Sequence, residues 1–130
     1  MCWLRYKRHY FTAKGSPAAE PIAAELLVHA NEELAHSDMI ATRIMQLQGE
    51  PNYDPDGLTS RSHAEYDASA NLVDMLREDL VAERIAVASY TEIIQWIGDK
   101  DPTTRRLFED ILVQEEEHAD DLLGFLQDVS

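Results

Sequence analysis

The chain has 130 residues, enough for one domain with a single buried core. Its 25 acidic residues outnumber 11 Lys and Arg, and the formal net charge of −14 excludes the basic surface that nucleic-acid binding needs. Such a charge favours small cations instead. No apolar run reaches the roughly 18 residues that a membrane span needs, and the single Cys2 cannot form an internal disulfide. We therefore expect a cytoplasmic protein with neither membrane nor nucleic-acid partners.

Four helices are expected, because apolar residues recur at three- and four-residue steps and no segment shows the alternation of a strand. The expected helices cover residues 1–14, 16–48, 64–97 and 101–127. Ser16-Pro17 and Asp101-Pro102 each place a capping residue before a proline at the first helical position. Glycines and prolines crowd segment 49–62, which is expected to be an irregular crossover. Short first and third connections then predict two antiparallel hairpins, and so an all-α four-helix bundle in a single domain.

The apolar stripes of the three long helices are interrupted in the middle by acids and histidines. The stripes comprise Ile22, Leu26, His29, Glu33, His36, Ile40, Ile44 and Leu47; Leu72, Leu76, Asp79 or Leu80, Glu83, Val87, Tyr90, Ile94 and Ile97; and Leu107, Ile111, Glu115, His118, Leu122 and Phe125. Burying an ionised carboxylate without a partner costs several kcal/mol. Three carboxylates and two histidines at one level need a shared positive charge, which divalent metal ions supply. The predicted metal ligands are Glu33, His36, Glu83, Glu115 and His118.

The spacing of these residues supports a metal site. Glu33 and His36 form a Glu-x-x-His motif, and so do Glu115 and His118. Residues three apart on a helix share a face, so each motif can present a carboxylate oxygen and an imidazole nitrogen together. One such motif is weak, since it is more often a solvated pair. Two motifs on the inner stripes of different hairpins, with Glu83 on a third helix, make a specific pattern.

The two halves of the chain look alike. Tyr6 precedes the first motif by 27 residues, and Tyr90 precedes the second by 25. Glu83 lies seven residues before Tyr90, so its counterpart would lie seven before Tyr6, two residues upstream of Met1. No acid precedes Glu20. We therefore expect a first helix that lacks its N-terminal half, through a misassigned start, a shortened chain or degeneration.

These residues resemble bacterioferritin and its ferritin-like relatives over nearly the whole chain. In that family two helices each contribute a Glu-x-x-His pair, and the other two each contribute one Glu. The resemblance implies that Glu33 and Glu115 bridge two iron ions. It also implies that His36 and His118 are imidazole ligands and that Glu83 is a terminal carboxylate ligand. Manganese or zinc could occupy the same donors.

The resemblance extends to other positions. Tyr6 matches the tyrosine beside the diiron centre and is the candidate catalytic residue. Leu34 stands where bacterioferritin has its haem-ligating methionine, so haem is not expected. The chain stops at Ser130 without the short fifth helix of bacterioferritin, so a homo-oligomer is expected as a dimer or as a 12- or 24-subunit shell. The implied function is oxidation of Fe(II) to Fe(III) by oxygen or peroxide, for iron storage or detoxification.

Two other functions fit the same residues. One is a diiron peroxidase or oxygenase, and the other is a degenerate bundle that acts only as an assembly subunit. Around the centre, Asp79 is expected either to accept an N–H from a ligand histidine or to be an exposed helix acid. His29 is expected to be a satisfied core histidine rather than the lining of a path to the metals. We expect Tyr90 to be a buried aromatic residue bonded to one of the carboxylates that interrupt the apolar stripes.

Overall fold

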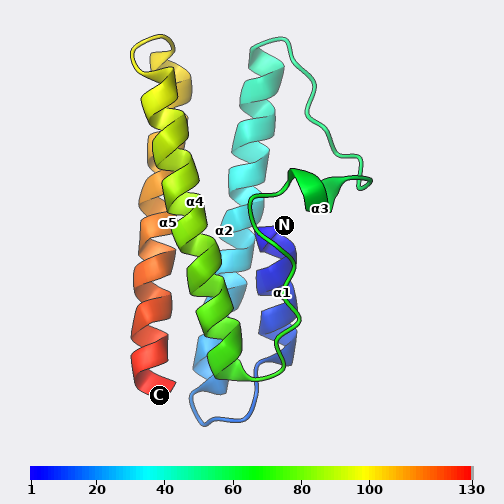
Figure 1. The fold of residues 1–130 in the computed structure, drawn as a ribbon, viewed down its shortest axis with the longest axis vertical. Helices are drawn as coiled ribbons and strands as arrows, with labels where there is room; N and C mark the ends of the chain where they lie inside the picture. Colours follow the sequence, from blue (N-terminus) through cyan, green and yellow to red (C-terminus); the bar gives the residue numbers. More distant parts are fainter. Residues whose placement is uncertain (130) are drawn as a thin grey trace.

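The computed structural model describes residues 1–129. Four helices lie side by side, and a fifth helix of four residues sits in the crossover (Figure 1). They are α1 (Cys2–Thr12), α2 (Ala19–Gln46), α3 (Leu58–Arg61), α4 (Leu72–Ile97) and α5 (Pro102–Val129). The described residues contain no strand, and none of their helices combines the length and apolarity of a membrane span. The predicted all-α four-helix bundle is confirmed.

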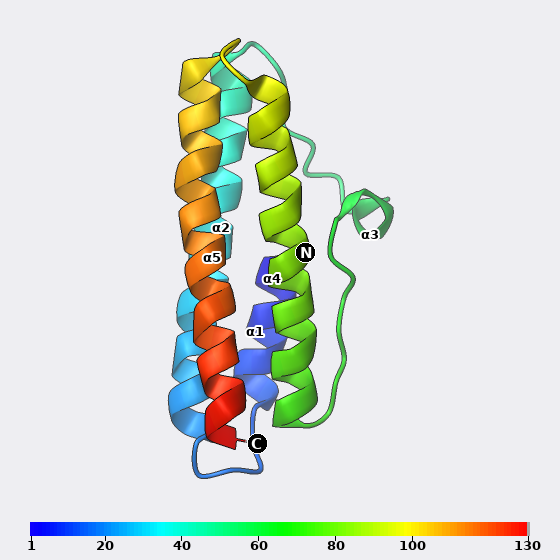
Figure 2. The same cartoon turned by 60° about the vertical axis from the view of Figure 1, so that its left-hand side comes forward.

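The helices form two hairpins joined by a crossover along the length of the bundle. The α1–α2 turn lies at one end and the α4–α5 turn at the opposite end, as Figure 2 shows from the side. Helix α1 has 11 residues against 28 in α2, and it runs beside only one half of α2. The N-terminus therefore lies near mid-height of the bundle, whereas α2, α4 and α5 extend further.

Helix α4 begins at Leu72, so the predicted start at residue 64 is wrong. Asn71 caps the helix, because its side chain accepts a hydrogen bond from the backbone N–H of Asp74 at 2.9 Å. Side chains of α1 hold the segment before Leu72 in a non-helical conformation. Arg5 donates to the Glu65 carbonyl at 2.5 Å, and Arg8 donates to backbone carbonyls further along the same segment. These contacts satisfy carbonyls that a helix would otherwise pair internally.

Of the two helix starts predicted from a capping residue followed by proline, Asp101-Pro102 is confirmed and Ser16-Pro17 is not. Helix α5 starts at Pro102 as predicted, and the Asp101 carboxylate accepts the backbone N–H of Thr104 at 3.1 Å. Helix α2 starts at Ala19 rather than at Pro17. The hydroxyl of Ser16 accepts the N–H of Ala18 at 3.2 Å, which closes a turn instead of capping the helix.

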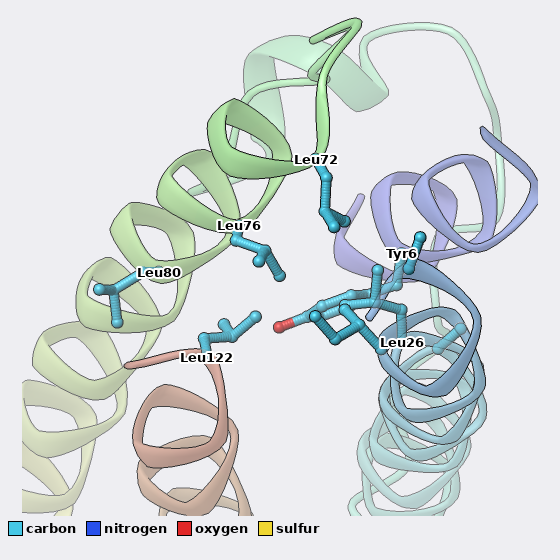
Figure 3. Close-up of a cluster of buried hydrophobic side chains, with 9 residues drawn as sticks. Tyr6, Leu26, Leu72, Leu76, Leu80 and Leu122 are labelled. Carbon is cyan, nitrogen blue, oxygen red and sulfur yellow. The ribbon is translucent and has the colours of Figure 1, made fainter. Parts of the chain in front are cut away.

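The main apolar cluster lies at the level of α1 and joins α1, α2, α4 and α5. Its members are Tyr6, Ala19, Ile22, Leu26, Ala30, Leu72, Leu76, Leu80 and Leu122 (Figure 3). The predicted stripes supply most of this cluster. Leu47 is an exception, because it lies just past the end of α2 and is 55% exposed. In Figure 3 the ring of Tyr6 lies among leucines of this cluster, so α1 is anchored next to the polar centre described below.

Candidate metal centre

The five predicted ligands meet in the middle of the bundle. Helix α2 contributes Glu33 and His36, α4 contributes Glu83, and α5 contributes Glu115 and His118. One ligand atom from each of these residues except His36 falls in a group whose members all lie within 4.8 Å of one another. His36 joins the group through its Nδ1, which lies 2.9 Å from Glu115 Oε1. Three helices thus bring the whole predicted set together.

The chemistry of this cluster fits a bound cation. Four of the five residues are buried, and the Glu33 side chain is only 9% exposed. Among the described residues, the buried side-chain atoms without a hydrogen-bond partner are Glu33 Oε1, His36 Nδ1, Glu83 Oε2, both Glu115 oxygens, His118 Nδ1 and His29 Nδ1. All but the last belong to the predicted ligands. Buried polar atoms are normally satisfied, and carboxylate and imidazole donors suit iron, manganese or zinc.

The outer nitrogen of each histidine predicted to be a ligand is held by a side chain of another helix. His118 Nε2 donates to Glu32 Oε2 at 2.5 Å, and His36 Nε2 donates to the side-chain oxygen of Gln114. These bonds place the proton on Nε2 and leave Nδ1 directed at the carboxylates, which is the arrangement that a metal ligand needs. Neither Glu32 nor Gln114 is among the residues predicted from the sequence. Their one signal is position, since each directly precedes the Glu of its Glu-x-x-His motif.

Tyr6 contacts the centre through Glu83. Its hydroxyl donates a hydrogen bond to Glu83 Oε1, and the residue is 2% exposed. Burial, together with the Glu83 carboxylate, raises the pKa of the Tyr6 hydroxyl, so it remains a donor. The related Tyr90 makes no hydrogen bond through its hydroxyl within residues 1–129, and its ring packs against Phe108 and His63. The predicted bond from Tyr90 to a carboxylate of the interrupted stripes is therefore wrong.

Without a cation, the cluster balances its charge with protons. Burial opposes the charged imidazolium of His36, but the neighbouring carboxylates of Glu115 and Glu33 outweigh it and raise the pKa of His36 to about 10. For His118, contacts with Glu33 and Glu83 likewise outweigh burial and raise the pKa to about 11. Burial raises the pKa of Glu115 to about 9. A metal ion would replace these protons.

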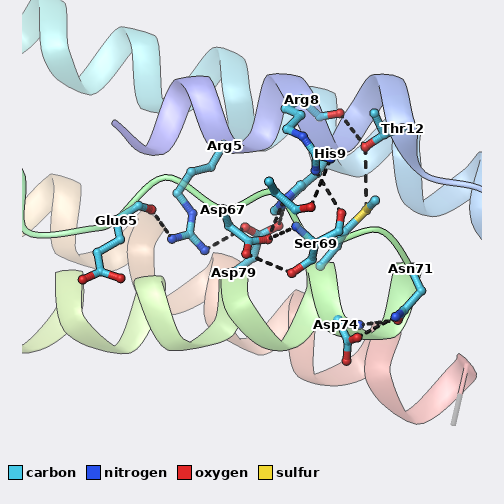
Figure 4. Close-up of polar contacts among 12 residues, drawn as sticks. Arg5, Arg8, His9, Thr12, Glu65, Asp67, Ser69, Asn71, Asp74 and Asp79 are labelled. Atoms are coloured by element: carbon cyan, nitrogen blue, oxygen red, sulfur yellow. Dashed lines mark hydrogen bonds and ion pairs between the residues drawn. The ribbon is translucent and has the colours of Figure 1, made fainter. Parts of the chain in front are cut away.

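Asp79 does not support a ligand histidine. It accepts hydrogen bonds from His9 Nδ1 at 2.8 Å and from Arg5 Nη2 at 3.5 Å (Figure 4). The other ring nitrogen of His9 pairs with Asp67 at 3.0 Å. Neither alternative predicted for Asp79 is correct, because the side chain is buried and its partners lie on α1, which the periodicity of α4 cannot reveal. This buried network ties α1 to α4 and to the segment before α4.

His29 is buried next to the centre. Its Nε2 pairs with Asp121 at 3.2 Å, and its ring stacks on His118 with the ring centroids 4.1 Å apart. Burial is the main cause that lowers the pKa of His29, which favours a neutral ring. Its Nδ1 has no partner, so the prediction of a satisfied core histidine holds for one nitrogen only.

A cavity of about 630 Å³ adjoins one side of the cluster. It lies between the N-terminal end of α1, the second half of α2 and the crossover, and most of its walls are apolar. Its polar groups include Glu33, His36 and Tyr90. Cys2 also lines the cavity, with Sγ 4.0 Å from His63 Nε2. Burial raises the pKa of the Cys2 thiol, so the thiol stays protonated.

Comparisons with known proteins place the chain in a family. The ferritin-like domain model matches residues 3–130. The dodecameric thioferritin described as the bacterioferritin-related protein of Bacteroides fragilis is 32% identical, with a TM-score of 0.92 over 98% of this chain and 77% of that chain. Dps from Thermosynechococcus elongatus is 19% identical, with a TM-score of 0.90 over 96% and 80% of the two chains, and shows the same fold. No curated protein gives a significant match. The chain belongs to the ferritin-like domain family.

Proposed function

We propose that this protein binds two Fe(II) ions at the centre formed by α2, α4 and α5 and oxidises them to Fe(III), for iron storage or detoxification. The observation that carries the proposal is the set of buried, unpartnered oxygen and nitrogen atoms that converge from Glu33, His36, Glu83, Glu115 and His118. In this arrangement Glu33 and Glu115 lie between the two histidines. Each contacts both rings, at distances of 2.9 to 3.9 Å.

The electron balance defines the reaction. Each Fe(II) gives up one electron, and two electrons with two protons reduce one oxygen molecule to hydrogen peroxide, or one peroxide molecule to two waters. The residues of the chain hold the two ions side by side, so that both electrons can be delivered together. Tyr6 holds Glu83 in place through its hydroxyl and is the residue beside the centre that we propose to be catalytic.

The relatives support iron handling in an assembly. The Bacteroides fragilis protein is called a dodecameric thioferritin. The ferritin-like domain model matches nearly the whole chain. We propose that this chain also acts as a homo-oligomer. A purely structural subunit is less consistent with the centre, because its buried carboxylates and imidazoles would have no reason to lack partners.

Anaerobic addition of Fe(II) followed by oxygen tests the proposal through the absorbance of the ferric product. The unsubstituted protein should oxidise two Fe(II) per subunit rapidly. Glu115→Ala should abolish this phase, because Glu115 contacts both ligand histidines. Glu116→Ala is the matched control, since Glu116 is the exposed neighbour on the same helix, and it should keep full activity. Rapid oxidation by Glu115→Ala would overturn the proposed site.

A second candidate function is oxygenation of an apolar substrate, favoured by one observation. The cavity of about 630 Å³ has largely apolar walls and touches Glu33 and His36. A diiron oxygenase needs such a pocket beside its metals. Turnover that requires an added organic substrate, with slow oxidation of Fe(II) alone, would select this function over the first.

A further inference from the structure

Helix α1 is joined to α4 by a series of polar pairs. From the end of α1 towards its start, the pairs are Thr12 with Met75, His9 with Asp79, and Tyr6 with Glu83. Successive members are three residues apart on α1 and four apart on α4, so each series follows one face of its helix. The last pair reaches the candidate metal centre, because Glu83 is one of its predicted ligands.

The middle pair is buried and has further partners on both sides. His9 is 0% exposed and Asp79 is 1% exposed. His9 Nδ1 donates to Asp79 at 2.8 Å, and Asp79 also accepts from Arg5. The other ring nitrogen of His9 lies 3.0 Å from an oxygen of Asp67, in the segment before α4. His9 therefore connects α1 to α4 and to this segment (Figure 4).

These pairs set the height of α1 along α4 more sharply than apolar packing does. The apolar contacts around Tyr6 have no preferred direction. A hydrogen bond, in contrast, weakens steeply when its distance and angle leave a narrow range. A shift of α1 by one residue is about 1.5 Å. It would break the bond from His9 to Asp79 and leave buried polar groups without partners.

The height of α1 matters to the metal centre because Tyr6 contacts two of its sides. The Tyr6 hydroxyl donates to Oε1 of Glu83, whose Oε2 has no hydrogen-bond partner. The Tyr6 ring lies edge-on to His29, and the His29 ring stacks on His118. A displaced α1 would withdraw Tyr6 both from Glu83 and from the ring that packs on His118.

We propose that His9 is a positioning residue for the metal centre. Bound to Asp79, it holds α1 at the height at which Tyr6 meets Glu83. Its bond to Asp67 extends this support to the segment before α4. His9 acts through Tyr6 and is not itself a ligand. This inference rests on the proposed metal site and adds a residue outside the ligand set that controls its affinity.

A matched pair of substitutions tests this role, because asparagine and glutamine each replace one nitrogen of the ring. The amide of His9→Asn takes the place of Nδ1 and can still donate to Asp79. The amide of His9→Gln takes the place of Nε2 and leaves Asp79 to Arg5. Both variants lose the imidazole, so urea denaturation should show similar losses of stability.

Calorimetric titration of the metal-free protein with Co(II) should separate the two variants. Outer partners of metal ligands typically change metal affinity by about 10- to 100-fold, so His9→Gln should weaken Co(II) binding by about tenfold. His9→Asn should bind Co(II) nearly as tightly as the unsubstituted protein. Equal Co(II) affinity of the two variants would overturn the inference while leaving the proposed function intact. Absence of Co(II) binding by the unsubstituted protein would overturn the proposed function as well.

Tyr6→Phe tests whether His9 acts through Tyr6. Once the hydroxyl of Tyr6 is gone, His9→Gln should cause no further loss of Co(II) affinity, as a double-mutant cycle would show. Arg8→Gln is the control, since Arg8 binds carbonyls of the segment before α4, and it should keep full affinity. A loss as large in the Tyr6→Phe background as in the unsubstituted protein would overturn the route through Tyr6.

Hydrogen exchange tests the same coupling without any substitution. Coupling between two sites is reciprocal, so Co(II) binding should slow amide exchange in α1 and in residues 65–69. Helix α3 is the internal control, and its exchange should not change. Exchange in α1 that is the same with and without bound Co(II) would overturn the inference.

Discussion

The hydroxyl of Tyr6 on α1 donates a hydrogen bond to the carboxylate of Glu83 on α4. The two residues are 77 positions apart, and both are 2% exposed. This bond connects the short first helix to the candidate metal centre, to which α1 contributes none of the predicted ligands. It also orients one carboxylate oxygen and leaves the other, Oε2, without a partner. The position of Glu83 therefore depends on α1.

Tyr6→Phe should lower the free energy of unfolding of the metal-free protein by about 1.5–3 kcal/mol, the range for a hydrogen bond to a charged group. The phenylalanine ring keeps the packing of Tyr6 in the apolar cluster, so the loss reports the bond to Glu83. Urea denaturation measures it. Tyr10→Phe is the control, since the Tyr10 hydroxyl makes no hydrogen bond within residues 1–129. Equal stability of the two variants would contradict the importance of the bond.

Asp79→Ala should destabilise the protein by about 3–5 kcal/mol, because it leaves the buried Arg5 and His9 without their shared carboxylate. Chemical denaturation followed by circular dichroism gives the value. Glu78→Ala removes the exposed neighbouring acid and should stay within about 0.5 kcal/mol of the unsubstituted protein. A loss below 1 kcal/mol for Asp79→Ala would show that the network in Figure 4 contributes little.

Leu122→Ala should cost about 2–5 kcal/mol, the range for a large-to-small change in a packed core. Leu122 is fully buried in the cluster of Figure 3, whereas the adjacent Leu123 is 42% exposed. Leu123→Ala is therefore a matched control with the same change in side chain. We expect it to lose less than about 1 kcal/mol. Thermal or urea denaturation measures both losses. Equal losses of stability in the two variants would contradict the helix register.

Stability of the metal-free protein should fall as the pH rises from about 6.5 to 9. The pKa values of His36 and His118 rise to about 10 and 11, and that of Glu115 rises to about 9. The native state therefore binds more protons than the unfolded state in this window, and unfolding becomes easier as protons are removed. Urea denaturation at pH 6.5, 7.5 and 8.5 measures the trend.

The double variant His36→Gln/His118→Gln controls for general charge repulsion in this acidic chain. Its stability should depend less steeply on pH than that of the unsubstituted protein. A divalent cation competes with the same protons. The stabilisation that Co(II) or Zn(II) provides should therefore grow with pH over the same range. Metal-free stability that rises between pH 6.5 and 9 would contradict the charge balance described for the centre.

Much of the fold could be predicted from the sequence, because the spacing of apolar residues follows from helix geometry alone. The stripes of α2, α4 and α5 identified the three long helices, the short connections predicted the hairpins, and each Glu-x-x-His motif lies within a single helix. The start of α4 could not be predicted in this way. Arg5 and Arg8 of α1 bind the carbonyls of the segment before Leu72, and a local pattern carries no information on such distant donors.

By itself, the sequence determined which residues share a helix face, and so which acids and histidines would point into the bundle. Only the tertiary structure decided the partners across helices: Glu32 with His118, Gln114 with His36, and His9 with Asp79. These pairs are separated by 70 to 86 residues. The physical reason is that periodicity fixes direction around one helix axis, whereas the contacts depend on the height at which two helices meet.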